Sequence, residues 1–371
     1  MLPYSTQLID EDDRLAVAHA LDAPLLTQGK LTQAFEDALC EFCNAKYALS
    51  FNSATSALYA AYKACDLQGH EAITTPISFV ATSNMLLQND STPVFCDITP
   101  QGNIDAQKIL PLITPRTKAI VSVDYGGLSV EVESIKQIAK EHNLTFISDS
   151  SHALGGHYND QKIGALADAT IFSFHPLKPI TTLEGGALLT DSLEIYERAK
   201  LIRAHGVLKQ NLWHYDVIDN GFNFRMNEVQ AALGISQLKK LPSFIERREE
   251  IASFYDEFFA GNPYFTTLHQ HNPHRSSNHL YPILLTPPYL AQKEKLFTAL
   301  QENGIGAQVH YKPIYQFSYY QNAPRQHFKD LHLKEAESFY NAELSIPCHQ
   351  KMTLALAKEV AQKILTIFQT L

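Results

Sequence analysis

The segment FNSATSAL carries the first arrangement of residues that could do chemistry. It places Asn52, Ser53, Ala54 and Thr55 between an apolar strand pattern and a helical pattern. Small hydroxyl residues and free backbone N–H groups at a helix N-terminus can bind an anion such as a phosphate group. Ordinary helix capping by Ser53 is the alternative interpretation, and this segment alone does not separate the two.

Three further segments place charged or polar side chains beside predicted element ends. Asp149 ends the apolar run LTFISDS, and Lys178 follows the run ATIFSF within FSFHPLK. Asn223 and Arg225 lie in GFNFRMNE, immediately before a helical pattern. A lone lysine or arginine at such a place is ordinarily solvated. Together, the residues support an anion site accompanied by a lysine and an aspartate.

The elements that position these residues follow from the hydrophobic pattern. Short strand patterns alternate with helical patterns such as 53–64 and 132–143, and several strands are continuously apolar, as strands buried on both faces are. We therefore predict an α/β fold with a mostly parallel sheet and a site at the carboxyl ends of its strands. The seven strand candidates are 46–51, 71–76, 92–97, 118–125, 144–150, 169–174 and 185–190.

The last third of the chain predicts a smaller second domain. After Asn227 the pattern is helical, and Pro242 is expected to kink or end a helix before a second one continues to about Tyr255. Strands are expected at 279–285 and 306–311, with a helix at 292–303 between them. We place the domain boundary near residue 240, giving domains 1–240 and 241–371.

Composition excludes several classes of protein. The 371 residues are 45% hydrophobic, and the net charge of -9 disfavours binding to nucleic acid. No run is long enough to span a membrane, and the N-terminus does not resemble a secretory signal. The five cysteines do not suggest a disulfide framework, so a cytoplasmic location is expected. Cys40 and Cys43 form a C-x-x-C within a helical pattern, without a second pair at metal-binding spacing, so no metal site is expected.

Taken together, the motifs resemble the DegT/DnrJ/EryC1/StrS sugar aminotransferases, which are pyridoxal-phosphate (PLP) enzymes of aminotransferase fold type I. The resemblance extends over the whole chain and implies a seven-stranded sheet with helices on both faces plus a smaller C-terminal α/β domain. The matching segments are LTQG, NSATSAL, TTPISFVATSN, PVFCDI, SDSSHALG, FSFHPLKPITTLEGGAL, RAHG, GFNFRMNEVQAALG, SSNHLYPI, HYKPIY and SIPCH.

The resemblance implies roles for individual residues. Lys178 is expected to form a covalent aldimine with PLP, and its freed amine to act as base and acid. Asp149 is expected to pair with the pyridine nitrogen and His152 to lie beside the phenolic oxygen. The other expected contacts are Ser53, Ala54, Thr55 and Ser173 for the phosphate, Phe79 for the ring, and Asn223 from the neighbouring subunit of a homodimer with shared active sites.

The expected substrate contacts also come from the resemblance. Within the family, the sequences of these motifs are most similar to those of enzymes that move an amino group from L-glutamate to C4 of a UDP-linked 4-keto-6-deoxy-N-acetylhexosamine, in pseudaminic acid biosynthesis. Another nucleotide-linked keto sugar and a non-catalytic regulatory protein on the same fold are the alternatives. Residues expected around the sugar nucleotide are Tyr4, Leu25, Leu26, Thr27, His310, Tyr311, Lys312 and Pro313.

One position departs from the family pattern. Many members carry an acid before the aspartate, whereas this chain has Ser148 there, in SDSSH. Because Asp149 itself is kept, we expect the substitution to alter the tuning of the site and not its chemistry.

Overall fold

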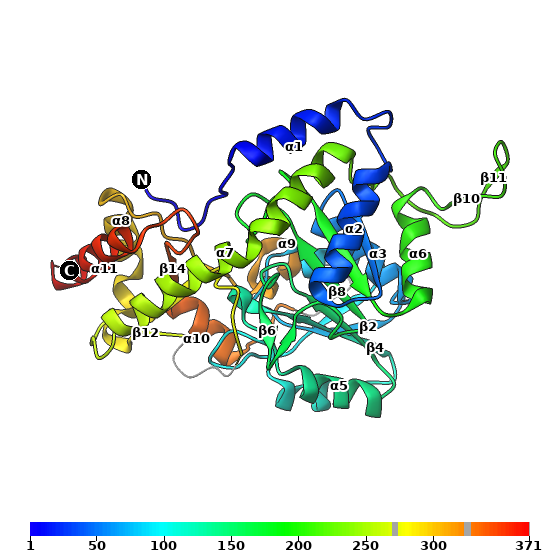
Figure 1. Cartoon of the computed structure of the whole chain (residues 1–371). Coiled ribbons are helices and arrows are strands. Elements are labelled where there is room, and N and C mark those ends of the chain that lie inside the picture. The colour runs from blue at the N-terminus through cyan, green and yellow to red at the C-terminus, as the bar shows by residue number, and fades with distance from the viewer. Residues whose placement is uncertain (269–273, 323–327, 371) are drawn as a thin grey trace.

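A seven-stranded sheet forms the centre of the structure, a computed structural model that describes residues 1–268, 274–322 and 328–370 (Figure 1). Its strands pair in parallel from β8 to β3, whereas β9 runs antiparallel to both of its neighbours. All seven strand candidates are present, so the predicted mostly parallel sheet is confirmed. In spatial order the strands are β1 (Tyr47–Phe51), β9 (Gly186–Thr190), β8 (Ala169–Ser173), β5 (Thr145–Asp149), β4 (Thr117–Val123), β2 (Glu71–Thr74) and β3 (Thr92–Phe95).

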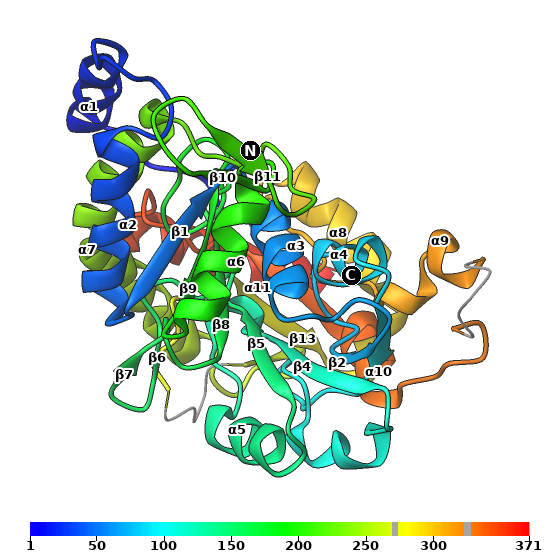
Figure 2. The ribbon, with the colours of Figure 1, turned by 90° about the vertical axis from the view of Figure 1, so that its right-hand side faces the viewer.

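Helices cover both faces of this sheet because successive strand residues point to opposite sides. Ile147 and Ile171 pack in the same core as α3 and α6, which lie in front of the sheet in Figure 2. Phe146 packs in a core with α5, and Phe172 in a core with α2. These helices are α2 (Lys30–Cys43), α3 (Ala54–Ala64), α5 (Val132–Glu141) and α6 (Leu193–Arg203).

A three-stranded antiparallel sheet organises the last third of the chain and has a hydrophobic core of its own. The predicted strand at 306–311 is wrong: Gln308 makes only an isolated bridge to Ser345. Two residues further on, the backbone N–H of His310 donates to the side chain of Glu343 and not to a strand. The elements here are β12 (Phe265–Thr267), β13 (Tyr281–Leu285), β14 (Glu343–Ile346), α8 (Lys293–Glu302), α9 (Ser318–Gln321), α10 (Lys334–Ala342) and α11 (Leu354–Thr370).

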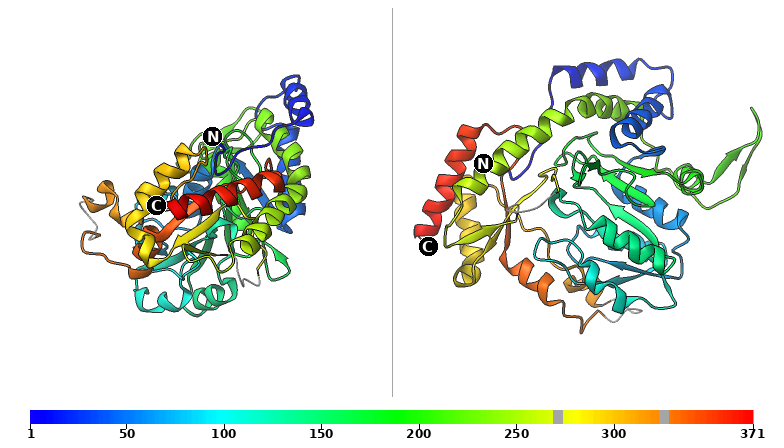
Figure 3. Two further views of the ribbon diagram at one scale, coloured as in Figure 1. Left: turned by 90° about the vertical axis from the view of Figure 1, so that its left-hand side faces the viewer. Right: turned by 60° about the horizontal axis from the view of Figure 1, so that its bottom comes forward.

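Helix α7 (Glu228–Phe258) connects the two cores (Figure 3). The predicted end of a helix at Pro242 is wrong, since one helix runs through the proline; the alternative, a kink there, stays a prediction. Buried side chains on both sides of it, Leu241 and Phe244, compensate for the missing backbone hydrogen bond. The core contacts of α7 change between Ile245 and Ile251, whereas residue 240 lies inside the helix. The boundary at 240 stays a prediction.

The remaining elements lie at the edges. Helix α1 (Glu11–Leu21) packs on α7, and α4 (Ala81–Gln88) packs beside α3. The hairpin of β10 (Val207–Lys209) and β11 (Tyr215–Val217) projects away from the body, as Figure 1 shows. A short pair, β6 (His157–Tyr158) and β7 (Gln161–Lys162), completes the strands of the described part. No helix of the described residues could cross a membrane.

Candidate active site

Asp149 occupies the carboxyl end of β5, near the middle of the large sheet. Its carboxylate is buried and accepts hydrogen bonds from Thr82 Oγ1 at 2.6 Å and from the Ser151 backbone N–H at 3.2 Å. Thr82 lies in the first turn of α4, so that helix and β5 fix the carboxylate from two sides. A buried, oriented carboxylate suits the task of holding a protonated ring nitrogen.

Lys178 lies in the turn that follows β8, and β8 is the strand next to β5. Burial lowers the pKa of Lys178 to about 7, and the charge of Asp149 opposes part of that shift. The amine is therefore substantially neutral near neutral pH, which is the nucleophilic form. The sheet thus brings the predicted lysine and aspartate into electrostatic contact.

Three histidines surround the Lys178 amine. Nε2 of His279 lies 3.4 Å from Lys178 Nζ, and the ring of His279 packs against that of His152 at 4.5 Å between centroids. Burial, followed by the Lys178 charge, lowers the pKa values of His152 and His279 well below the ordinary value and that of His310 to about 3. Neutral imidazoles therefore line the site, and they add no positive charge that would disfavour a cationic reaction partner.

The hydrogen bonds of His152 determine its tautomer. The Gly126 backbone N–H donates to Nδ1 at 3.2 Å, so Nδ1 acts as the acceptor. The neutral ring must then carry its proton on Nε2, which faces the Tyr311 hydroxyl at 3.2 Å. His152 is consequently a donor, and its acceptor in this structure is the Tyr311 hydroxyl oxygen.

An anion-binding corner lies beside these groups. Ser53 caps α3 by accepting from the Ser56 N–H at 3.1 Å, so the capping interpretation holds for its hydroxyl. The first N–H groups of the helix have no acceptor within the helix itself and remain able to bind an anion. Gly186 allows the helix to approach, because a Cβ there would meet Ala54 N at 2.4 Å. Ser173 pairs with Gly186 across strands β8 and β9, and it therefore lies at the same corner.

The structure also places the residues expected around the cofactor ring and the shared site. Phe79 precedes α4, its carbonyl accepts from the backbone N–H of Thr82, whose side chain binds Asp149, and the residue is 60% exposed. Asn223 is exposed, and its carbonyl accepts from Asn52, one residue before the Ser53 cap.

The expected substrate contacts fall into two groups. Tyr4 packs edge-on against His310, and Tyr311 contacts His152, so these residues join the site. Lys312 lies over the ring of Phe317, and Pro313 is buried behind it. In contrast, Leu25, Leu26 and Thr27 form an exposed stretch that pairs with the start of α7 through Asn227 and Glu228.

Asp124 is a buried acid that accepts a hydrogen bond from Ser148, the residue that replaces the usual acid. It lies at the end of the neighbouring strand β4, where its Oδ2 accepts from Ser150 Oγ at 2.6 Å and Ser148 Oγ at 3.2 Å. Burial raises the pKa of Asp124 to about 6 in spite of these hydrogen bonds. The substituted serine therefore belongs to a buried hydrogen-bonded cluster that holds the turn between Asp149 and His152.

Sequence reasoning assigned no role to Thr82, His279 or Arg248, although all three are close to the site. Arg248 is completely buried in α7 and donates to the carbonyls of Asn278 and Cys348 at 3.0 and 2.7 Å. Thr82 and His279 lie within the matching segments TTPISFVATSN and SSNHLYPI, which was the only available signal. Their contacts cross long stretches of chain, which no local pattern reports.

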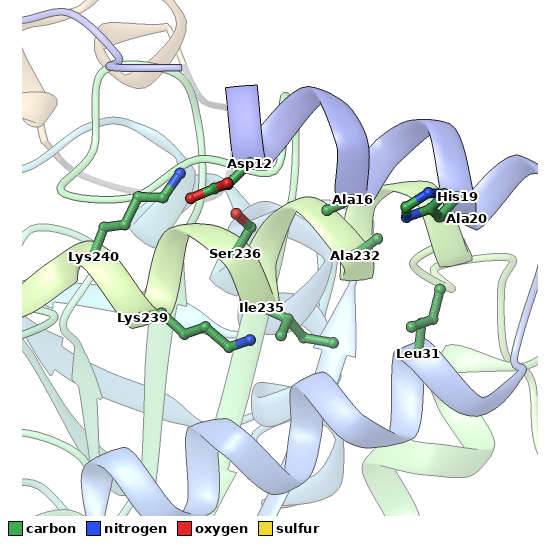
Figure 4. Close-up of a pocket in the computed structure, with 10 residues that line it drawn as sticks. All are labelled: Asp12, Ala16, His19, Ala20, Leu31, Ala232, Ile235, Ser236, Lys239 and Lys240. Carbon is green, nitrogen blue, oxygen red and sulfur yellow. The ribbon is translucent and has the colours of Figure 1, made fainter. Parts of the chain in front are cut away.

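A groove of about 490 Å³ elsewhere in the structure does not contain this chemistry. It lies between α1, α2 and α7 and is lined mainly by small apolar groups and the two lysines of α7, Lys239 and Lys240 (Figure 4). None of its ten lining residues belongs to the Lys178 site. Chemistry, and not concavity, therefore identifies the candidate active site.

The donor set fits PLP. A carboxylate, an amine with a lowered pKa and a helix N-terminus match a pyridine nitrogen, an aldehyde and a phosphate. His279, whose Nε2 lies 3.4 Å from Lys178 Nζ, also has a buried Nδ1 without a hydrogen-bond partner among the described residues.

Comparisons with known proteins agree with this geometry. The chain matches the DegT/DnrJ/EryC1/StrS aminotransferase family over residues 7–365. It is 51% identical over 370 residues to the UDP-4-amino-4,6-dideoxy-N-acetyl-beta-L-altrosamine transaminase of Helicobacter pylori, covering 99% of this chain and 98% of that protein.

Solved structures show the same fold. Helicobacter pylori PseC, described as an aminotransferase involved in the biosynthesis of pseudoaminic acid, superimposes with a TM-score of 0.97 at 50% identity over 100% of both chains. The PLP-form of a putative sugar aminotransferase, Spr1654 from Streptococcus pneumoniae, gives a TM-score of 0.92 at 27% identity, covering 100% of this chain and 99% of that one. Fold type and PLP dependence are thereby confirmed.

Proposed function

Because the chain belongs to the DegT/DnrJ/EryC1/StrS aminotransferase family, we propose that it transfers an amino group from L-glutamate to C4 of a UDP-linked 4-keto-6-deoxy-N-acetylhexosamine, in pseudaminic acid biosynthesis. The observation that carries this proposal is the 51% identity, over 99% of the chain, to a transaminase whose name specifies that product. The amine of Lys178 supports the reaction type, because its pKa of about 7 leaves about half of it neutral at pH 7, under the electrostatic influence of Asp149.

Bound PLP supplies an aldehyde that condenses with amines and a ring that accepts electrons. Asp149 would hold the pyridine nitrogen in its protonated form, since a buried negative charge favours the cation. Lys178 Nζ would be the point of covalent attachment, and as a free amine with a lowered pKa it would remove a proton and return it. His152 would lie beside the phenolic oxygen, while its Nε2–H donates to the Tyr311 oxygen.

The rest of the site binds and orients. Ser173 and the first N–H groups of α3 would bind the phosphate, and Phe79 would pack against the ring. Tyr4, His310 and Tyr311 contribute to the substrate pocket from the side of the smaller sheet. Exclusion of water by the surrounding histidines and aromatic rings preserves the lowered pKa of Lys178.

We also propose that the active enzyme is a homodimer. The hairpin of β10 and β11 exposes Leu212 and Trp213 almost completely, together with Tyr215 and Val217. Such an apolar projection is typical of a surface that another protein covers. Asn223 follows the hairpin in sequence and would then reach the site of the second subunit. Mixing inactive Lys178→Ala and Asn223→Ala proteins should restore partial activity, and verified mixed dimers without any activity would exclude a shared site.

The test of the substrate uses purified PLP-loaded protein. Glutamate should bleach the cofactor absorption band, and the UDP-linked 4-keto sugar should restore it with formation of a 4-amino sugar. A panel of other nucleotide-linked keto sugars, with the C4 configuration of each product determined, separates this substrate from related ones. A protein without any spectral response to glutamate would instead favour a non-catalytic role.

A further inference from the structure

Glu343 is a buried carboxylate that the mechanism above does not use. It is the first residue of β14 and is completely buried. Its Oε2 accepts from the His310 backbone N–H at 2.6 Å, and its Oε1 accepts from Ser345 Oγ at 2.6 Å. The titratable groups that face it are Tyr125, Tyr311, His310 and Lys293. A buried acid is costly unless its partners satisfy it, so its position calls for a reason beyond packing.

Hydrogen bonds around Glu343 hold three polar groups of His310: its backbone N–H, its ring Nδ1 and its carbonyl. The ring Nδ1 lies 2.8 Å from Ser345 Oγ, the same hydroxyl that donates to Glu343. The carbonyl accepts from the Tyr125 hydroxyl at 2.6 Å. With the backbone N–H bound to the carboxylate, His310 is held at its amide, its ring and its carbonyl.

The next residue transmits this constraint into the site. Tyr311 follows the fixed carbonyl directly, and its hydroxyl lies 3.2 Å from His152 Nε2. Because Gly126 makes Nδ1 the acceptor, Nε2–H donates to the Tyr311 oxygen. The tyrosine's own proton is then directed to a different acceptor. Burial raises the pKa of Tyr311 well above its ordinary value, so the hydroxyl keeps that proton.

We propose that Glu343 is a positioning residue, which fixes the His310–Tyr311 backbone so that the Tyr311 hydroxyl meets the Nε2–H of His152. This inference rests on the proposed function, since it assigns His152 to the cofactor side of the site. Glu343 acts through Tyr311 and does not touch the reacting groups. A purely structural role would instead lower stability without any dependence on the Tyr311 hydroxyl.

A double-mutant cycle separates these two roles. In Glu343→Gln the amide nitrogen replaces one acceptor oxygen, so one of the two donors loses its partner. We expect kcat for amino transfer to fall about tenfold, with KM for glutamate changed by less than about twofold. In the Tyr311→Phe background the same substitution should cost less than about twofold. Equal losses in both backgrounds would overturn the proposal.

The matched control is Glu359→Gln, which removes a carboxylate from an exposed pair with Lys363 on α11. It should leave kcat and the absorption maximum of the bound cofactor unchanged, whereas Glu343→Gln should shift that maximum. If Glu343→Gln fails to fold, Ser345→Ala replaces it, because it frees the His310 ring and leaves the bond between Glu343 and the His310 N–H. We expect about a threefold loss of kcat, again only when the Tyr311 hydroxyl is present.

A second measurement is independent of the cofactor. In apo-protein labelled with 15N, the His152 ring should show a protonated Nε2, identified by its loss in His152→Gln. That signal should move in Glu343→Gln and in Tyr311→Phe but not in Glu359→Gln. An unmoved signal would contradict the proposal. If the variants show the expected shifts but the wild-type protein does not transaminate, the proposed function alone is disproved.

Discussion

Two clusters meet at Lys178, and they are built in different ways. The strand-end cluster, formed by Asp149, Ser173, Lys178 and the start of α3, comes from the ends of neighbouring elements of the large sheet. The second, which we term the cross-core cluster, contains Arg248, His279, His310 and Glu343. Its members hydrogen-bond to residues far away in sequence, such as Arg248 to Cys348 and Lys178 to His279.

This difference teaches how one active site divides its tasks. The proposed cofactor contacts of the strand-end cluster lie where the backbone geometry of neighbouring elements brings them together. The groups that set protonation and orientation lie in the cross-core cluster, where burial makes each hydrogen bond consequential. Substitutions in the first cluster should therefore affect chemistry, and those in the second should affect stability, protonation or alignment.

The largest effect is expected for Lys178→Ala. Removal of the amine placed to attach the cofactor and move the proton should lower kcat by about 10⁴-fold or more. The loss of this amine should not lower the melting temperature of the apo-protein near pH 7, because a buried amine with a lowered pKa destabilises the folded state at that pH. Steady-state turnover with the keto sugar, measured beside thermal melting, checks both statements. Repeated turnovers at a rate near that of the wild type would remove the basis of the strand-end assignment.

Arg248→Met tests the cross-core cluster. The guanidinium satisfies the carbonyls of Asn278 and Cys348, and the substitution leaves both buried without a donor. We expect the free energy of unfolding to fall by about 2 to 4 kcal/mol. Arg247→Met is the matched control, since the neighbouring arginine makes an exposed pair with Glu250 and should cost less than about 0.5 kcal/mol. Equal losses in urea denaturation would show that burial of Arg248 has no energetic consequence.

A pH dependence is expected where the clusters meet. Because the pKa of Lys178 is lowered from 10.5 to about 7, the rate of covalent PLP capture by apo-protein should rise with pH and level off, with a midpoint near pH 7. Asp149 opposes the shift, so Asp149→Asn should move the midpoint lower. Stopped-flow absorbance across the pH range measures both midpoints.

The same shift has a consequence for stability. Above 10.5 the lysine is neutral in both folded and unfolded chains. As the pH falls toward about 7, only the unfolded chain takes up the proton, so the folded state loses relative stability over this window and none further below it. Lys178→Met should remove that part of the pH dependence of melting in the apo-protein. If Lys178 in the folded protein titrated near its ordinary pKa, the site would be more accessible to water than the geometry indicates.

The smallest effect is expected for Ser148→Ala. Asp124 Oδ2 would lose one of its two hydroxyl donors and keep Ser150. We predict a loss of about 1 kcal/mol in the free energy of unfolding and less than about a threefold change in kcat. Ser150→Ala, which removes the shorter hydrogen bond, should cost more. The reverse ranking would place Ser148 and not Ser150 at the centre of the cluster.

Some features of this protein were determined by the sequence alone. The seven strands are predicted from apolar runs, because local hydrophobic patterns report burial directly. Asp149 and Lys178 are singled out as candidates because they lie at or after the ends of such runs. The segments shared with the family added the expected cofactor and the roles proposed for individual residues.

Only the tertiary structure decided the rest. Helix α7 continues through Pro242 because Leu241 and Phe244 are buried on both sides of it. The segment 306–311 is not a strand, because the N–H of His310 binds a distant carboxylate. The tautomer of His152 and the contact of His279 with Lys178 likewise depend on partners that only packing supplies. A buried polar group takes whichever partner the fold brings to it, and local sequence patterns do not encode that choice.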